Sequence, residues 1–350
     1  METSSPIQRY LRAAPKAELH VHLEGSIQPT TLLTLAKRNG VELPVQTIEE
    51  MQTWFRFRDF DHFVNIYFAI TRCLRTVEDY ELIVYEFGAA MAQQNIRYAE
   101  VTFTPSIHRF EYQIPHDTYF TGLMRGRERA HTDFGVEIRW VFDIVRSIED
   151  AAENRLRADY TAAVAIESRA DGVVALGLGG AEVGYPPERF QHWFDQARAA
   201  GLHSAPHAGE TVGPASVWEA IRTLGAERLG HGVRSMEDPA LIKYLADQHL
   251  PLEVCPTSNI CLGIYPSLAE HPLPGLQAAG IPITINSDDP ALFNITLTHE
   301  VELLESAFHF DLDTINECLL NGVRYSFLPS EQKQALETTF RAELFELQPK

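Results

Sequence analysis

The chain has 350 residues, of which 45% are hydrophobic and 22% charged, as expected for a soluble globular enzyme of one large domain or two ordinary ones. The formal net charge of −19 argues against nucleic acid or an anionic membrane surface as the main partner, because both would repel the protein. No segment is apolar for long enough to span a bilayer, and residues 1–14 do not resemble a secretory signal, so we expect a cytoplasmic protein.

Short β-rich runs alternate with helical patterns along most of the chain. We predict eight strands, over 18–23, 97–103, 137–145, 172–178, 203–207, 228–232, 251–255 and 282–286. The segments between them carry apolar residues at helical spacing; Pro29 suits the first turn of the first such helix, and Gly40 ends it. Such alternation is typical of a parallel sheet.

Eight strand–helix units in a chain of this length favour a closed (β/α)₈ barrel, or TIM barrel. The alternative is a doubly wound open sheet, but no glycine-rich phosphate-binding fingerprint follows the first strand. Residues 298–346 are predicted to form three further helices that cover the barrel. No linker-like break divides the chain, so we predict a single barrel domain over residues 1–350.

An aromatic cluster lies between the first two strands. It comprises Trp54, Phe55, Phe57, Phe60 and Phe63. We expect most of these side chains to pack in an outer helical layer and one or two to form an apolar lid over a pocket.

Polar residues gather at the predicted carboxyl ends of four strands, where the chemistry of TIM barrels is located. His20 and His22 share one face of the first strand because side chains alternate along a strand. The other polar residues follow the fifth, sixth and eighth strands: His207 and Glu210, His231, and Asp288 and Asp289. Each alone has a structural explanation, but their convergence on one rim predicts a functional site.

The residue types indicate a metal site with hydrolytic chemistry. Zinc binds imidazole and carboxylate groups readily and lowers the pKa of a bound water to about 7. Four residues are expected to hold one Zn²⁺ and leave room for a water: His20, His22, His207 and Asp288. We expect His231 to orient this water and help deprotonate it. We expect Glu210 to be a proton donor whose pKa is raised by burial.

Four motifs carry a family resemblance: His20-x-His22, His207-Ala208-Gly209-Glu210, His231-Gly232 and Ser287-Asp288-Asp289-Pro290. In this order they resemble the adenosine deaminase family of metal-dependent hydrolases. These are (β/α)₈ barrels with one Zn²⁺ that convert 6-aminopurines to the 6-oxo product and ammonia. The resemblance implies that Glu210 protonates purine N1 while hydroxide, positioned by His231, attacks C6.

The resemblance also implies a set of substrate contacts. Asp289 is expected to accept a hydrogen bond from the N7 side of the ring, and Gly180 to offer its backbone N–H to N3. His22 and Glu24 complete the substrate-binding set, with Glu24 near the position of a ribose hydroxyl.

The identity of the 6-aminopurine is less constrained. Nucleoside deaminases of the family usually carry aspartate where Glu24 stands, and two further aspartates in the run that here reads Gly177-Leu178-Gly179-Gly180-Ala181-Glu182. The continuation over 182–187 resembles bacterial adenine deaminases. Adenosine or deoxyadenosine is the first choice of substrate, and adenine or aminodeoxyfutalosine remains open.

Two other functional classes fit the sequence less well. A two-metal amidohydrolase would need a bridging lysine or glutamate at the end of the fourth strand, and residues 173–177 contain no lysine. A non-catalytic binding protein would have little need of Glu210 and His231 beside a metal site. The sequence does not indicate an oligomeric state.

Overall fold

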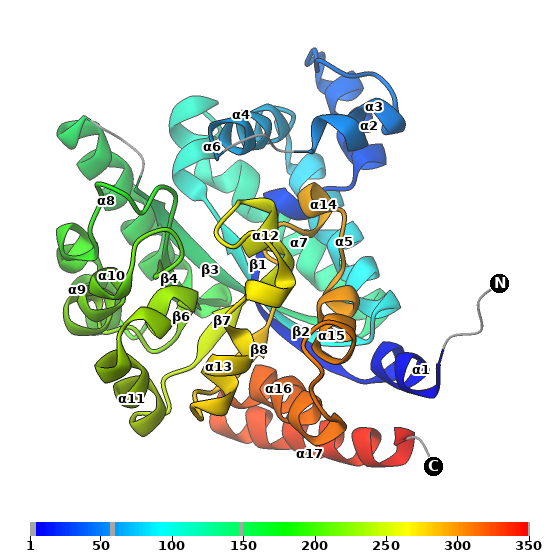
Figure 1. Ribbon diagram of the computed structural model, residues 1–350. Coiled ribbons are helices and arrows are strands. Elements are labelled where there is room, and N and C mark those ends of the chain that lie inside the picture. Colours follow the sequence, from blue (N-terminus) through cyan, green and yellow to red (C-terminus); the bar gives the residue numbers. More distant parts are fainter. Residues whose placement is uncertain (1–4, 57–59, 147–149, 349–350) are drawn as a thin grey trace.

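The computed structural model describes residues 5–56, 60–146 and 150–348 (Figure 1). Eight strands lie side by side in chain order: β1 (Lys16–His22), β2 (Ile96–Phe103), β3 (Glu137–Val145), β4 (Val173–Gly179), β5 (His203–Ala208), β6 (Leu229–His231), β7 (Leu252–Val254) and β8 (Ile283–Ile285). Every neighbouring pair is parallel. The predicted boundaries agree with these to within two residues.

The two ends of the sheet meet between β8 and β1. Val21 and Asp288 form a parallel bridge there. The Asn286 side-chain oxygen accepts hydrogen bonds from the backbone N–H groups of Leu19 and His20, at 2.8 and 3.1 Å. These contacts close the sheet into the predicted (β/α)₈ barrel.

Helices surround the barrel (Figure 1). They are α1 (Pro6–Ala13), α2 (Pro29–Asn39), α3 (Ile48–Trp54), α4 (Phe60–Thr71), α5 (Val77–Gln93), α6 (Pro105–Glu111), α7 (His116–Phe134), α8 (Ala151–Glu167), α9 (Gln191–Ala199), α10 (Pro214–Glu219), α11 (Pro239–Asp247), α12 (Pro256–Cys261), α13 (Leu273–Ala278), α14 (Pro290–Phe293), α15 (Leu297–Ser306), α16 (Leu312–Arg324) and α17 (Ser330–Leu347). The last three confirm the predicted C-terminal helices. In the described part of the chain, no helix has the length and apolar character needed to span a membrane.

Local chemistry explains several helix boundaries. Thr76 and Asp79 form a capping box at the start of α5, in which each side chain accepts a hydrogen bond from the other residue's backbone N–H. Gly40 ends α2 with a φ of +63°, a conformation that glycine adopts without a steric penalty.

Five short helices were not predicted: α1, α3, α6, α12 and α14. The last three lie just beyond the ends of strands, α6 and α12 directly and α14 after a short loop, and each begins with a proline: Pro105, Pro256 and Pro290. Proline is favoured at the first helical position, where its missing N–H needs no partner. The helix predicted over 214–224 also differs, because α10 ends at Glu219 and a π-helical turn over Ala220–Leu224 follows.

Candidate active site

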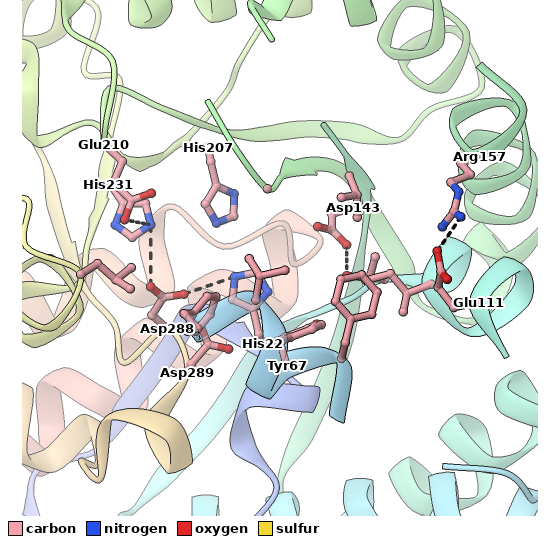
Figure 2. A pocket seen from close by; sticks show the side chains of 18 residues that line it. His22, Tyr67, Glu111, Asp143, Arg157, His207, Glu210, His231, Asp288 and Asp289 are labelled. Carbon is pink, nitrogen blue, oxygen red and sulfur yellow. Dashed lines mark hydrogen bonds and ion pairs between the residues drawn. The ribbon is translucent and has the colours of Figure 1, made fainter. Parts of the chain in front are cut away.

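A cavity of about 260 Å³ opens at the carboxyl ends of the strands (Figure 2). All of the predicted site residues except His20 and Glu24 line it: His22, Gly180, His207, Glu210, His231, Asp288 and Asp289. The remaining wall is largely aromatic and aliphatic, from α4, α6 and the end of β3. The barrel therefore brings the separate motifs into one concave site.

Histidines and a carboxylate cluster at the base of this cavity. His20, His207, His231 and Asp288 each place one potential ligand atom within 4.8 Å of the others. Nε2 of His22 lies 3.3 Å and Nε2 of His20 lies 3.5 Å from the same Asp288 oxygen. His20 Nε2 is buried without a hydrogen-bond partner among the described residues. Imidazole nitrogens and a carboxylate around a shared centre are the donor set that zinc prefers, so the residues fit this metal.

Strained backbone supports the cluster. His231 and Asp288 have φ angles of +59° and +62°, a left-handed conformation that is uncommon outside glycine. Such residues cost of order 1–3 kcal/mol each and concentrate at functional sites. Asp288 is held in place by β1, because His22 donates its N–H to the Asp288 carbonyl at 2.8 Å and Asp288 donates to the His20 carbonyl at 3.1 Å.

A second set of buried groups orients the cluster. The Glu253 carboxylate lies 2.8 Å from His20 Nδ1 and 2.6 Å from Nε of Arg228, which is itself fully buried. Glu253 thereby directs the Nδ1 proton of His20 away from the cluster and leaves Nε2 facing it. On the other side, Ser258 donates a hydrogen bond to Asp288 at 2.6 Å. None of these three supporting residues, Glu253, Arg228 and Ser258, was predicted from the sequence.

Glu210 enters the cavity beside His231. Its Oε1 atom is buried without a hydrogen-bond partner in the described structure and lies 3.6 Å from His231 Nε2. Burial, with the nearby Asp288 carboxylate, raises the pKa of Glu210 to about 8. This rise confirms the predicted direction and leaves a protonated carboxyl group available at neutral pH.

Glu182 holds the loop that carries Glu210. Its carboxylate accepts hydrogen bonds from four consecutive backbone N–H groups, at 2.6 to 3.2 Å: Gly209, Glu210, Thr211 and Val212. Burial alone would raise the pKa of Glu182, but Arg146 and these hydrogen bonds outweigh burial and lower it. Arg146 also donates to the His207 carbonyl at 2.8 Å. This role of Glu182 was not predicted from the sequence, where the residue stands out only as part of the run after the fourth strand.

Glu24 lies behind the cavity wall. It is fully buried, and one carboxylate oxygen contacts Nε2 of His108 at 2.9 Å and the N–H of Thr104 at 3.3 Å. Its contact with a ribose hydroxyl therefore remains a prediction. An aspartate from β3 lines the wall instead: Asp143 accepts a hydrogen bond from the Thr104 hydroxyl at 2.6 Å.

Asp143 occupies space that β4 leaves open. A Cβ atom on Gly179 would lie 2.4 Å from Asp143 Oδ2, so a side chain there would clash. At Gly177, where nucleoside deaminases usually carry aspartate, a Cβ atom would lie 3.1 Å from Asp143 Cβ, so the neighbouring strand places a carboxylate beside this position.

The aromatic cluster divides as expected. Phe63 lines the cavity, whereas Phe55 is buried in the core and Trp54 packs against it. Phe57 and the side chain of Phe60 lie outside the described residues. Two further aromatic residues that were not predicted, Tyr67 and Phe68, also line the cavity.

A charged pair marks the far end of the cavity. Nη2 of Arg157 lies 2.6 Å from the Glu111 carboxylate, and both residues line the wall. Figure 2 shows this pair on the opposite side of the cavity from His207, His231 and Asp288. The cavity therefore extends well beyond the histidine cluster.

Comparisons with known proteins agree with this geometry. The aminodeoxyfutalosine deaminase of Streptomyces coelicolor is 41% identical over 93% of this chain and 84% of its own length. The crystal structure of adenine deaminase from Arthrobacter aurescens superposes with a TM-score of 0.87 at 32% identity, covering 95% of this chain and 99% of that one. A Burkholderia ambifaria amidohydrolase solved with bound zinc gives a TM-score of 0.88 at 27% identity, covering 99% and 95%.

The family model described as Adenosine deaminase matches residues 15–342, nearly the whole chain. The match spans the barrel, all four motifs and most of the C-terminal helices. The chain therefore belongs to the adenosine deaminase family of hydrolytic deaminases, enzymes that act on carbon–nitrogen bonds.

Proposed function

We propose that this enzyme replaces the 6-amino group of an N9-substituted 6-aminopurine by oxygen, with aminodeoxyfutalosine as the preferred substrate. One observation carries the choice: the cavity continues from the histidine cluster to Arg157 and Glu111, which gives room for a substituent beyond the purine ring. The similarity to the S. coelicolor aminodeoxyfutalosine deaminase supports it. Adenosine, the first choice from the sequence, has less support, because the two named deaminases described above are an aminodeoxyfutalosine deaminase and an adenine deaminase.

Adenine is the second candidate. The A. aurescens adenine deaminase favours it, with an almost complete superposition. A free base would fill only the part of the cavity next to the cluster and leave the Arg157 end without a role in binding.

The proposed cofactor is one zinc ion, held by His20, His22, His207 and Asp288. When bound, it would supply a Lewis acid and a water that is ionised near neutral pH. The donor set around Asp288 and the zinc in the B. ambifaria structure support this assignment.

The chain's own side chains would handle the protons. Glu210, protonated at neutral pH, donates to purine N1 as the water oxygen adds to C6, and His231 orients that oxygen. The C6–N bond then breaks, the amine leaves as ammonia with the proton of the new C6 hydroxyl group, and C6 keeps the oxygen as a carbonyl. Gly180, with a φ of +83°, places its backbone where a purine edge can approach closely.

Asp289 would donate the hydrogen bond to purine N7, whereas the sequence led us to expect that it accepts one. Burial and the adjacent Asp288 raise the pKa of Asp289 to about 8, and its Oδ1 is buried with no hydrogen-bond partner among the residues that the structure describes. A protonated carboxyl group donates a hydrogen bond, and N7 of a neutral purine accepts one. Asp289 would therefore donate to N7.

The test is a parallel assay of zinc-loaded enzyme on aminodeoxyfutalosine, adenosine, deoxyadenosine, AMP and adenine, by ammonia release and ultraviolet change. We expect the highest kcat/KM with aminodeoxyfutalosine. Arg157→Met should lower that value about tenfold or more and leave adenine turnover unchanged, since adenine does not reach Arg157. Highest activity on free adenine would overturn the proposal in favour of adenine deamination.

A further inference from the structure

A line of hydrogen bonds connects the backbone of α13 to His231. The Leu273 N–H lies 3.2 Å from His271 Nδ1. His271 Nε2 lies 3.1 Å from Asn259 Oδ1, and Asn259 Nδ2 lies 3.2 Å from His231 Nδ1. All three side chains are at most 3% exposed. The proton positions along this line can be deduced from its first member.

The Leu273 amide sets the direction of the first hydrogen bond, because a backbone N–H can only donate. His271 Nδ1 must therefore accept. Burial lowers the pKa of His271 to about 4, so the ring is neutral at pH 7 and carries its single proton on Nε2. That proton is donated to Asn259 Oδ1.

The Asn259 amide then has only one satisfactory orientation. If the amide were reversed, its N–H₂ group would face the Nε2–H of His271, and two donors would oppose each other in a buried site. With the oxygen toward His271, the N–H₂ group points to His231 Nδ1, which has to accept. A neutral imidazole that accepts at Nδ1 carries its proton at Nε2.

We propose that Asn259 and His271 are positioning residues that hold His231 in the Nε2–H tautomer, so that His231 presents a hydrogen-bond donor to the oxygen that attacks C6. His231 Nε2 faces the cavity, 3.6 Å from Glu210 Oε1 and 3.8 Å from Asp288 Oδ2. The identity of the attacking oxygen rests on the proposed function; the tautomer does not.

Two roles were predicted for His231 from the sequence, and this tautomer is compatible with only one of them. Orientation of the water is retained, since an N–H donor can hold an oxygen lone pair. Deprotonation by His231 is not, because Nε2 already carries a proton and Nδ1 is occupied by Asn259. A side-chain base is not needed at this step, because a water bound to zinc would lose its proton to solvent near neutral pH.

Asn259→Asp gives a sharp test. A carboxylate has nearly the same shape as the amide it replaces. One oxygen still accepts a hydrogen bond from the Nε2–H of His271, and the other accepts a hydrogen bond from a protonated Nδ1 of His231. The variant should therefore invert the His231 tautomer and keep the His271 contact. Asn316→Asp is the matched control, because Asn316 accepts a hydrogen bond from the Tyr10 hydroxyl at 2.6 Å and does not line the cavity.

The direct measurement is the pair of ¹⁵N shifts of His231 in zinc-loaded, ¹⁵N-histidine-labelled enzyme, assigned by loss of the signal in His231→Gln. We expect a protonated Nε2 and an unprotonated Nδ1 in the natural protein and in Asn316→Asp, and the reverse in Asn259→Asp. A protonated Nδ1 in the natural protein, or an unchanged tautomer in Asn259→Asp, would overturn the inference.

Activity gives the second measurement. Loss of one donor to the attacking oxygen typically lowers kcat by about 10²-fold or more, so Asn259→Asp should show such a loss in kcat with little change in KM. A kcat within threefold of the natural enzyme would contradict the proposed role. If the shifts are as expected but no 6-aminopurine is converted, the proposed function fails and the tautomer assignment stands.

Discussion

His271 should make the protein lose stability on the acid side of neutral pH. Burial lowers the pKa of this imidazole from 6.5 to about 4 in the folded protein. Between these values the unfolded chain binds one more proton than the folded chain, so the free energy of unfolding falls as the pH falls. The stabilisation is fully present above pH 6.5, and its complete loss is worth about 3 kcal/mol, at about 1.4 kcal/mol per pKa unit.

Within the described part of the chain, burial is the cause of the shift and no charged side chain contributes to it. The groups against His271 are Asn259, the Leu273 backbone and the rings of Tyr265 and Phe308, whose centroids lie 5.3 and 5.7 Å away. Tyr265 is uncharged in this range because burial raises its pKa.

His271→Gln isolates the contribution, because glutamine can still donate to Asn259 and does not titrate. Urea unfolding at pH 7.5 and at pH 5 gives, for each pH, the difference in free energy of unfolding between the natural protein and the variant. When the pH is lowered from 7.5 to 5, the free energy of unfolding of the natural protein should fall by about 2 kcal/mol more than that of the variant. Other histidines titrate in both proteins and cancel, as does any loss of metal. A difference that stays constant within about 0.5 kcal/mol would refute a buried, neutral His271.

Three further predictions concern the site. Glu210→Gln should lower kcat by about 10²-fold or more with unchanged zinc content, since it removes the proton donor; near-normal turnover would exclude that role. Glu182→Ala should lower the free energy of unfolding by about 3 kcal/mol or more, because several buried N–H groups lose their acceptor; exposed Glu331→Ala is the control, and equal stability of the two variants would contradict the argument. Chelation should abolish activity, and about one equivalent of Zn²⁺ per chain should restore it; a requirement for two equivalents would favour a two-metal amidohydrolase.

Much of the fold could be predicted because its signals are local. Strands such as β4 and β8 are short apolar runs, and breakers such as Gly40 mark helix ends between the strands. The motif residues could be grouped because the carboxyl ends of parallel barrel strands share one rim. The short helices were missed because a proline directly after a strand is compatible with both a loop and a first helical turn, as at Pro105 and Pro256.

The supporting residues could not be predicted, for a different reason. Glu253, Glu182 and Asn259 are ordinary polar residues whose role depends on partners distant in sequence; Glu253 reaches His20 across 233 positions. The left-handed backbone at His231 and Asp288 is also invisible in the sequence, since neither residue type requires it. Tertiary packing, not local preference, imposes both features.

The closure of the barrel has a consequence for biosynthesis. His20 and Asp288 face each other across the seam between the first and last strands, where Leu19 and Asn286 are already 267 positions apart. At about 5–20 residues per second on a ribosome, the interval between the emergence of the two halves is of order tens of seconds. With the ligand set proposed above, a nascent chain could not assemble the metal site early, and zinc capture would be one of the last events in maturation. Scarcity of zinc would act on finished barrels and not on the growing chain.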